Sequence, residues 1–497
     1  MAEREPLALS SAAPAFPKRG RGRCLFPPVV ALLIMTVPVC AASQNQDDPG
    51  NILLQARESV MKTIRQLPRY VCTQTVDRKR YEPADPEYGT NGIKRPRSCD
   101  NTIAAARRDV WKRRLASADR LRLDVAVSQG SPNLESEMYS WAGEDRFSRS
   151  DLFDFVREGA VSTGSFASML ASIFANPAAR FSYAGDSLQD GRMVSEFGFH
   201  ISRERSEYRY IFGEDPSEQV AVAYGGSLLI DSSNSDLVRV RVLSEQLPPD
   251  TGACELTQDL RYARVHIRDS DFLLPAEDET TIIHIDGTEA ENRIQYSACR
   301  EFRGQSTVSF DDGEQPAEAP KRANPGLPPI SLPPGLAFKI VITDRIDVAT
   351  AAAGDPIHGR LKTAISDRSG KVLVPEGAVV TGRIMRIQRS YHNARSWDPE
   401  RERTTHFQLE PPLVIAVRLD SLDTGKGPQP FQASFDSGAR RFVKQTGPLS
   451  VRAGIGSLEE LHSAERQPAL GTFEFWDNDP DHAVKSGLES NWVTARP

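Results

Sequence analysis

The sequence predicts a mainly β protein: a curved antiparallel half-barrel sheet with covering helices, followed by a small β-barrel domain. Three observations predict this fold class. Runs of alternating apolar and polar residues, bounded by turn residues, recur from Asp119 to Phe310 and again after Pro334. Two helical patterns interrupt the first set of strands, and helices of that kind must cover a sheet. A proline-rich stretch, residues 311–334, separates the two sets and predicts an extended linker.

The chain begins with a pattern typical of a signal peptide. A basic region is followed by the apolar run Val29–Met35, which is too short to cross about 30 Å of hydrocarbon, and then by small residues. We expect residues 1–42 to be removed by cleavage after Ala42; an uncleaved membrane anchor is the alternative. The basic residues are Lys18, Arg19, Arg21 and Arg23. Export and a net charge of −6 argue against a nucleic-acid partner.

Four cysteines remain after the leader: Cys72, Cys99, Cys254 and Cys299. An even number of cysteines in an exported chain predicts two disulfides, and four cysteines allow three connectivities. Nearest-neighbour pairing, Cys72 with Cys99 and Cys254 with Cys299, closes two short loops within the first domain. No CxxC spacing is present, which argues against a zinc site or a thioredoxin-like redox motif.

The first domain, residues 43–310, opens with a helix over Asn51–Leu67, where apolar residues recur every three or four positions before Pro68. A strand follows at Tyr70–Val76. The clearest alternation runs from Leu121 to Val127, with Met138–Trp141 as its expected partner.

Helical patterns then appear at Asp151–Glu158, with Ser150 as N-cap and Gly159 as terminator, and at Thr163–Phe174. Strands resume after them and predict an antiparallel sheet that is curved by strand twist. The expected strands are Phe181–Tyr183, Ser195–Ile201, Tyr208–Phe212, Gln219–Tyr224, Leu260–Ile267, Thr280–Ile285, Arg293–Cys299 and Thr307–Phe310.

A hairpin centres this sheet. Ser227–Ile230 and Leu237–Leu243 are β-prone and flank a cluster of Asp, Ser and Asn that suits a turn. In the second strand we expect Leu237, Arg239 and Arg241 to face solvent, with the intervening valines buried.

One dense basic cluster occurs in the mature chain: Arg107, Arg108, Lys112, Arg113 and Arg114. It can rest on anionic lipid head groups, each cation adding about 1 kcal/mol near the surface. The alternative is a solvated element in which charged and apolar residues alternate.

The second domain, residues 335–440, shows strands with little helical pattern, which favours a small β-barrel. Its expected strands are Phe338–Val348, Ile357–Ile365, Lys371–Val374, Val379–Ile387, Val414–Leu422 and Phe431–Phe435. Residues 441–497 are expected to pack loosely, with one strand at Gly471–Trp476.

The sequence has none of the familiar catalytic or metal-binding spacings. The eight histidines are scattered, without HExxH spacing, and there is no GxSxG elbow, Walker loop or post-strand GxGxxG. Asp477–Asp481 starts like a calcium loop, but His482 and Leu488 replace the required Gly and Glu. We therefore expect no enzyme activity, cofactor or metal.

An apolar ligand site is the most specific hypothesis. One helix face, laid across a curved sheet, either completes a core or closes a hydrophobic cavity against a strand wall. The candidate ligand-facing residues are Phe166, Met169, Leu170, Ile173 and Phe174 on the helix, and Phe197 and Phe199 on the strand.

The hairpin from Gly226 to Pro248 resembles part of the outer-membrane lipoprotein-sorting superfamily (LolA and LolB types). The segments Tyr70–Thr75 and Trp141–Glu144 are also similar to bacterial secreted proteins that carry this hairpin. The resemblance implies a half-open antiparallel barrel, lidded by helices, that shelters acyl chains. It covers roughly residues 119–310.

In the second domain, Gly354–Pro356 and Val374–Gly382 are similar to the TrbI-type barrel of conjugal-transfer channels, where the Pro-x-Gly and the later Gly shape a hairpin. A channel role does not follow from these positions alone.

Taken together, these features predict a non-enzymatic protein that is periplasmic or extracellular after leader removal, with association to the outer membrane as a further expectation. Its first domain is expected to bind an apolar ligand, lipid or lipidated partner. The alternative is a scaffold that binds envelope proteins and no ligand. Hydrolase activity would require clustered acids or a nucleophile pair brought together by the fold.

Overall fold

The fold is given by a computed structural model. It describes residues 48–83, 98–107, 113–129, 135–144, 147, 152, 155–156, 161–212, 219–245, 247–302, 330–390, 392–398, 403–409, 413–435, 442–444, 450–454, 471–476 and 483–495. The leader with its cleavage site, the Thr307–Phe310 strand and the calcium-like Asp477–Asp481 lie outside these residues, as do most of the 151–158 helix and of the linker.

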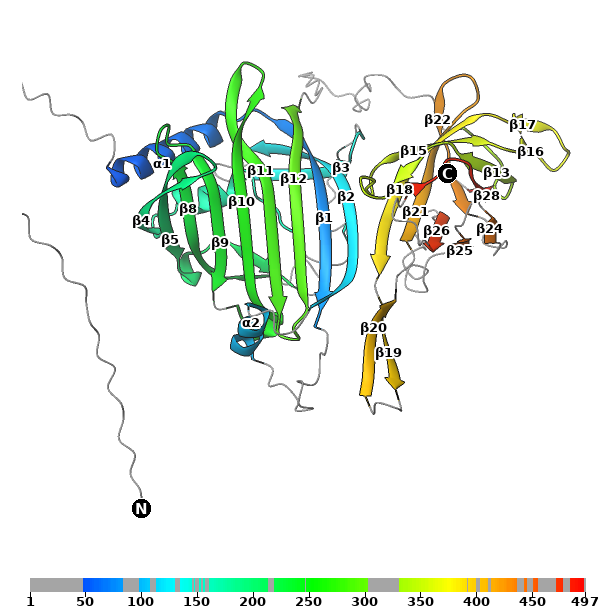
Figure 1. The fold of residues 1–497 in the computed structure, drawn as a ribbon. Coiled ribbons are helices and arrows are strands. Elements are labelled where there is room, and N and C mark those ends of the chain that lie inside the picture. The colour runs from blue at the N-terminus through cyan, green and yellow to red at the C-terminus, as the bar shows by residue number, and fades with distance from the viewer. Residues whose placement is uncertain are drawn as a thin grey trace, which may run out of the picture. The chain divides into compact units, whose positions relative to one another are not determined.

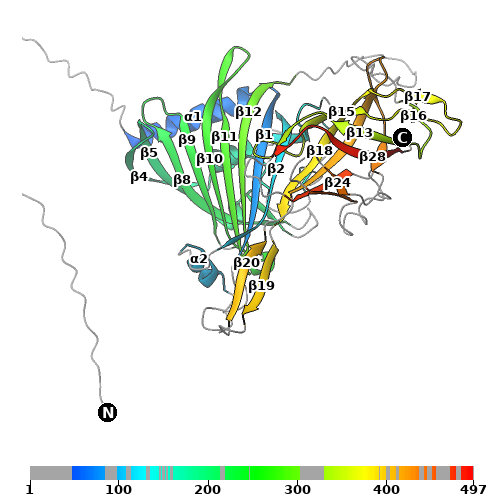
Figure 2. The same ribbon diagram turned by 45° about the vertical axis from the view of Figure 1, so that its right-hand side comes forward.

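The first domain is a curved antiparallel sheet in the order β4-β5-β8-β9-β10-β11-β12-β1-β2-β3, as Figures 1 and 2 show. Its edges, β3 and β4, are not paired with each other in the described residues, so the sheet is a half-barrel and the predicted fold class is confirmed. Its strands are β1 (Tyr70–Glu82), β2 (Arg114–Gln129), β3 (Glu135–Trp141), β4 (Arg180–Gln189), β5 (Arg192–Ile201), β8 (Ala223–Asp231), β9 (Leu237–Glu245), β10 (Ala253–Ile267), β11 (Ser270–His284) and β12 (Glu289–Glu301).

β1 pairs with β12, so the first and the last strands of this sheet in sequence are neighbours in space. Tyr70 lies opposite Glu301. Two short strands, β6 (Arg209–Ile211) and β7 (Gln219–Ala221), form a separate hairpin. Single-turn 3₁₀ helices lie at Arg203–Arg205 and Pro249–Thr251.

The central hairpin is β8–β9, as predicted, but its facing pattern differs at Leu237 and at Val238, which was expected to be buried and is only half-buried. The register shifts near the turn, so that Ile230 lies opposite Leu237 while Leu229 lies opposite Arg239. A β-bulge of this kind reverses the side chains beyond it. Leu237 is therefore buried on the same side as Val240, and the prediction that it faces solvent is wrong.

The first helix, α1 (Pro49–Gln66), confirms the predicted periodicity. Asp48 caps it by accepting a hydrogen bond from the Gly50 amide at 3.2 Å, and Pro49 occupies the first turn, where a missing N–H does no harm. Ile52, Ala56 and Val60 form its buried face. A second helix, α2 (Cys99–Arg107), was not predicted.

The third helix, α3 (Ser168–Phe174), is shorter than the predicted Thr163–Phe174. Gly164 has φ of +79°, and residues 165–167 form turns. A left-handed residue at that position ends helical hydrogen bonding, so the helix begins only after it.

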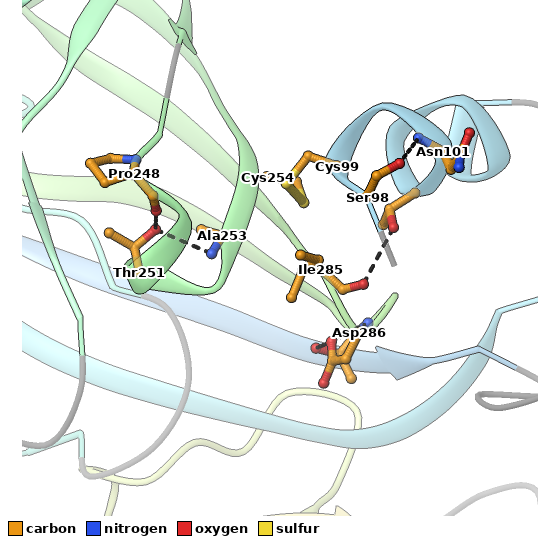
Figure 3. Close-up of a disulfide and its surroundings, with 11 residues drawn as sticks. Ser98, Cys99, Asn101, Pro248, Thr251, Ala253, Cys254, Ile285 and Asp286 are labelled. Carbon is orange, nitrogen blue, oxygen red and sulfur yellow. Dashed lines mark hydrogen bonds between the residues drawn. A yellow bond between two sulfur atoms is a disulfide. The ribbon is translucent and has the colours of Figure 1, made fainter. Parts of the chain in front are cut away.

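Two disulfides tie the first domain together, but the nearest-neighbour pairing is wrong. Cys72 on β1 bonds Cys299 on β12, and Cys99 on α2 bonds Cys254 on β10. Figure 3 shows the second bond beside Ile285, whose carbonyl accepts a hydrogen bond from the Thr102 hydroxyl at 3.3 Å. The β1–β12 pairing brings Cys72 to Cys299 over 227 residues, a proximity that no local pattern could reveal.

The second domain is a sheet wrapped around its own apolar core, with described strand order β24-β25-β26-β21-β18-β15-β13-β28-β23. Its C-terminal residues, expected to pack loosely, instead supply β28, which lies between β13 and β23 and buries Trp492. Its strands are β13 (Ala337–Ile342), β14 (Ile346–Asp347), β15 (Pro356–Leu361), β16 (Ile365–Ser366), β17 (Val372–Val374), β18 (Val379–Ser390), β19 (His392–Asp398), β20 (Arg403–Leu409), β21 (Leu413–Asp423), β22 (Pro428–Pro430), β23 (Ala433–Phe435), β24 (Phe442–Lys444), β25 (Ser450–Gly454), β26 (Gly471–Trp476), β27 (Ala483–Val484) and β28 (Leu488–Thr494).

The chain from β2 also contacts the second domain directly. Backbone pairing joins residues 117–119 of β2 to residues 388–390 of β18. The Arg122 guanidinium forms an ion pair with Asp355, and Arg383 donates a hydrogen bond to the Ala142 carbonyl at 2.9 Å.

Among the described helices, none combines the length and apolar character that a membrane crossing requires.

Candidate functional site

The roof of the half-barrel, defined here as α1 together with residues 161–174, carries the predicted apolar face. All seven candidate ligand-facing residues are buried, with exposed fractions between 0% and 5%. Six of them share one apolar cluster with α1: Met169, Leu170, Ile173, Phe174, Phe197 and Phe199. Phe166 lies in the adjoining cluster, between the rings of Tyr70 and Tyr296 at centroid distances of 5.6 and 4.9 Å.

The roof and the sheet therefore meet as the sequence predicts, but they meet closely. Phe174 stacks on Phe181 and Phe199 packs edge-on against Tyr224. Whether the seven side chains also face a ligand stays a prediction, because in this form they face one another.

One apolar cavity lies where the roof meets the sheet. Its volume is about 10 Å³, the room of about one water molecule. Its lining is α1 on one side, Phe166, Ala167 and Leu170 on another, and β11 below. The lining residues are Val60, Thr63, Ile64, Leu67, Tyr70, Phe166, Ala167, Leu170, Leu273 and Leu274. A cavity of this size does not hold an acyl chain.

Beside this cavity lies a buried polar group that the sequence analysis missed. Asp278 on β11 has 0% exposure, and its Oδ2 accepts three hydrogen bonds. The donors are the Ser165 hydroxyl at 2.6 Å, the Gln258 amide at 2.8 Å and the Ser162 hydroxyl at 3.1 Å. Thr280 donates to Oδ1 at 3.3 Å. Four neutral donors thus satisfy one carboxyl group inside the half-barrel.

Asp278 belongs to a row of inward-facing polar residues on neighbouring strands. Gln258 on β10 lies opposite Thr280 on β11, which lies opposite Asn292 on β12, and all three are buried. The signal for this row was present in the sequence: Asp278, Thr280 and Ile282 alternate with outward residues, so Asp278 shares the face of a core isoleucine.

Two tyrosines bond to residues that donate to this carboxyl. The Tyr208 hydroxyl donates to Gln258 at 3.3 Å, and the Tyr262 hydroxyl donates to the Ser165 carbonyl at 3.0 Å. Burial raises the pKa of the Asp278 carboxyl, while its side-chain hydrogen bonds act in the opposite direction. Burial also raises the pKa of Tyr208 and Tyr296, and the nearby Asp278 charge adds to both shifts.

A second tyrosine contact fastens α3 itself. The Tyr224 hydroxyl lies 2.9 Å from the Ser172 hydroxyl and donates to the Ser172 carbonyl at 3.2 Å. Burial raises the pKa of Tyr224 to about 12, so it stays a neutral donor at physiological pH. Both ends of residues 161–174 are thus joined to the sheet by polar contacts.

Two of the three described members of the basic cluster, Arg107 and Arg113, are ion-paired. Arg107 pairs with Glu255 at 2.6 Å, and Arg113 pairs with Glu289. Both contacts favour the solvated, ion-paired interpretation over a lipid-facing one.

Histidines and carboxylates do not assemble into a metal centre in the described residues. His266 is exposed and lies 2.8 Å from Asp271, while burial lowers the pKa of His284.

Comparisons with known proteins give distant likenesses. No protein-family model matches this chain, and no curated protein matches it. Three solved structures are similar to it, with TM-scores of 0.24, 0.24 and 0.19. TM-scores this low support no conclusion about fold or function.

The first is a DUF1329 family protein from Desulfovibrio piger, with 8% identity over 50% of this chain and 93% of that one. The second is a putative outer membrane lipoprotein-sorting protein domain from Vibrio parahaemolyticus, with 13% identity over 52% and 94%. The third is a LolA superfamily protein from Nitrosomonas europaea, with 11% identity over 51% and 93%. No likeness of the second domain to a TrbI-type barrel is among them.

Proposed function

We propose that this protein is an exported, non-enzymatic envelope protein whose first domain binds an apolar ligand, a lipid or a lipidated partner beneath the roof. The observation that carries the proposal is the cavity between α1, Leu170 and β11, whose lining residues are mostly apolar. It lies inside a sheet whose edge strands β3 and β4 are not paired with each other in the described residues, so the sheet can admit a ligand without breaking a closed ring of strands.

The roof is the part that must yield. Residues 161–174 contribute one short helix, and α3 has seven residues, too few to be stable alone. Its closure depends on burying Leu170, Ile173 and Phe174 against the sheet. An apolar chain that replaced those contacts would restore much of the buried area, so closed and occupied forms can be close in free energy.

One disulfide joins two strands and the other joins a helix to a strand, and both suit a protein that functions outside the reducing cytoplasm. The leader pattern supports the same location. We therefore place the protein in the periplasm or outside the cell, in contact with the outer membrane or its lipoproteins.

A scaffold without a ligand is the second candidate function. Two observations favour the scaffold. The cavity is small, and the seven candidate residues are buried as they would be in an ordinary hydrophobic core.

The experiment measures lipid by mass spectrometry in the mature protein purified from its own envelope, and titrates the apolar fluorophore 1-N-phenylnaphthylamine. Thr63→Trp fills the cavity from its half-buried rim and should weaken fluorophore binding by about tenfold, since about 1.4 kcal/mol of contact is lost. Lys62→Trp, at the adjacent exposed position, is the control and should leave binding unchanged. Absence of lipid together with absence of fluorophore binding would favour the scaffold.

A further inference from the structure

The buried carboxyl of Asp278 is unexplained by packing alone. An apolar residue at an inward position of β11 would need no partner, whereas a carboxylate with 0% exposure must be compensated by hydrogen bonds. Two of its donors, Gln258 and Thr280, come from the sheet. The other two, Ser162 and Ser165, come from the roof.

The carboxyl and the apolar cavity are linked through one short segment of the roof, residues 162–167. Ser165, which donates to Asp278, directly precedes Phe166 and Ala167, which line the cavity. Movement of residues 161–167 away from the sheet would therefore enlarge the cavity and take both serine hydroxyls from Asp278 in a single step. The sheet donors would stay, and two acceptor positions on the carboxyl would face the opened space.

We propose that Asp278 is the polar end of the ligand site, and that it selects amphipathic ligands with an ammonium head over those with an acidic head. This inference rests on the proposed function. Opening of the roof would bring water to the carboxyl and remove the burial that raises its pKa, so the opened site favours the ionised form. An ionised carboxylate only accepts hydrogen bonds, so the ligand head must donate. In the closed form, the Ser162 and Ser165 hydroxyls occupy the position that the ligand head takes in the occupied form.

An ammonium head satisfies this site better than a neutral one. Every donor that the described structure gives to Asp278 is neutral, so the carboxylate charge is balanced by no cation there. A charge-assisted hydrogen bond is about twice as strong as a neutral one. An acidic head would add a like charge beside the carboxylate and would be disfavoured.

The other titratable groups near this position reinforce the preference. Tyr208 donates to Gln258 and Tyr262 to the Ser165 carbonyl, so both bond to residues that themselves donate to the carboxyl. Burial raises the pKa of Tyr208 and Tyr296, which keeps both uncharged at neutral pH. Glu137 lies on the roof side, where it accepts from the Gly164 amide at 2.8 Å, and it adds a second negative charge. Neither the tyrosines nor Glu137 supplies a cation.

The test compares dodecylamine, dodecanol and dodecanoate, which share one chain and differ in the head, by calorimetric titration of the full mature protein at neutral pH. We expect the amine to bind about tenfold more tightly than the acid, a difference of about 1.4 kcal/mol. Asp278→Asn should abolish that preference. Glu277→Gln removes the same charge from the adjacent residue, whose carboxylate pairs with Arg261 on the outer face, and should keep the preference.

A double variant covers the case in which Asp278→Asn does not fold. Ser162→Ala with Ser165→Ala removes the competing roof hydroxyls and should tighten amine binding several-fold relative to the acid. Equal binding of all three amphiphiles to the wild type, or an unchanged preference in Asp278→Asn, would overturn the head-group inference while leaving apolar binding intact. Failure of all three to bind would instead refute the proposed function.

Discussion

Removal of the Cys72–Cys299 disulfide should destabilise the first domain strongly while leaving the second disulfide in place. The two bonds are nested: Cys99 and Cys254 lie inside the segment that Cys72 and Cys299 enclose. Their separations are 227 and 155 residues, so with the inner bond intact the outer bond closes a loop of the difference, 72 residues. The chain-entropy relation for a loop of that length gives about 4 kcal/mol at 25 °C.

The variant is Cys72→Ala with Cys299→Ala, in the chain from Ser43, which lacks the leader cysteines Cys24 and Cys40. Urea unfolding followed by circular dichroism measures the free energy of unfolding, and a thiol reagent under denaturing conditions counts free cysteines. We expect a loss of about 4 kcal/mol and no free thiol, because Cys99 and Cys254 remain bonded.

Two outcomes would refute this reasoning. Nearest-neighbour pairing would leave Cys99 and Cys254 without their partners in this variant, so two free thiols would show that the nested pairing is wrong. An unchanged free energy of unfolding would show that the 72-residue loop does not restrict the unfolded chain as the relation assumes.

Three further predictions concern the sheet and its roof. Gly226→Ala should lower the free energy of unfolding by more than about 3 kcal/mol, since φ is +152° and the added Cβ would fall on the Arg241 carbonyl oxygen; a smaller loss in urea titration would contradict that close approach. Ile173→Ala, at a fully buried position of α3, should cost about 2–5 kcal/mol, whereas Leu188→Ala, 69% exposed, should change stability by less than about 0.5 kcal/mol; equal effects in thermal unfolding would count against a packed roof. Because burial raises the pKa of Asp278 in the folded state, its contribution to stability is greatest below about pH 4 and is lost as pH rises through the folded-state pKa. Asp278→Asn should therefore remove that pH-dependent loss, and parallel pH profiles for the two proteins would contradict it.

Local patterns in the sequence accounted for most of the individual elements. The alternation around Leu123 and the three- to four-residue spacing around Val60 each predicted the correct element, because a strand or a helix buries one face whatever lies opposite. The same reasoning found the seven apolar residues that the roof and β5 bring together.

Predictions failed where a single residue breaks the local pattern. The bulge at the β8–β9 turn moved Leu237 to the buried face, and Gly164 delayed the start of α3. Both changes arise from backbone geometry that the hydrophobic period does not encode.

By itself the sequence determined the mainly β character, the first helix, the central hairpin and the set of cysteines available for bonding. Only the tertiary structure decided that β1 pairs with β12, that Cys72 therefore bonds Cys299, that β28 completes the second domain, and that Asp278 lies beneath two roof serines. The reason is that periodicity reports how a segment divides its own faces. Which distant segment covers a face depends on the burial and hydrogen bonding of the whole chain, summed over contacts far apart in sequence.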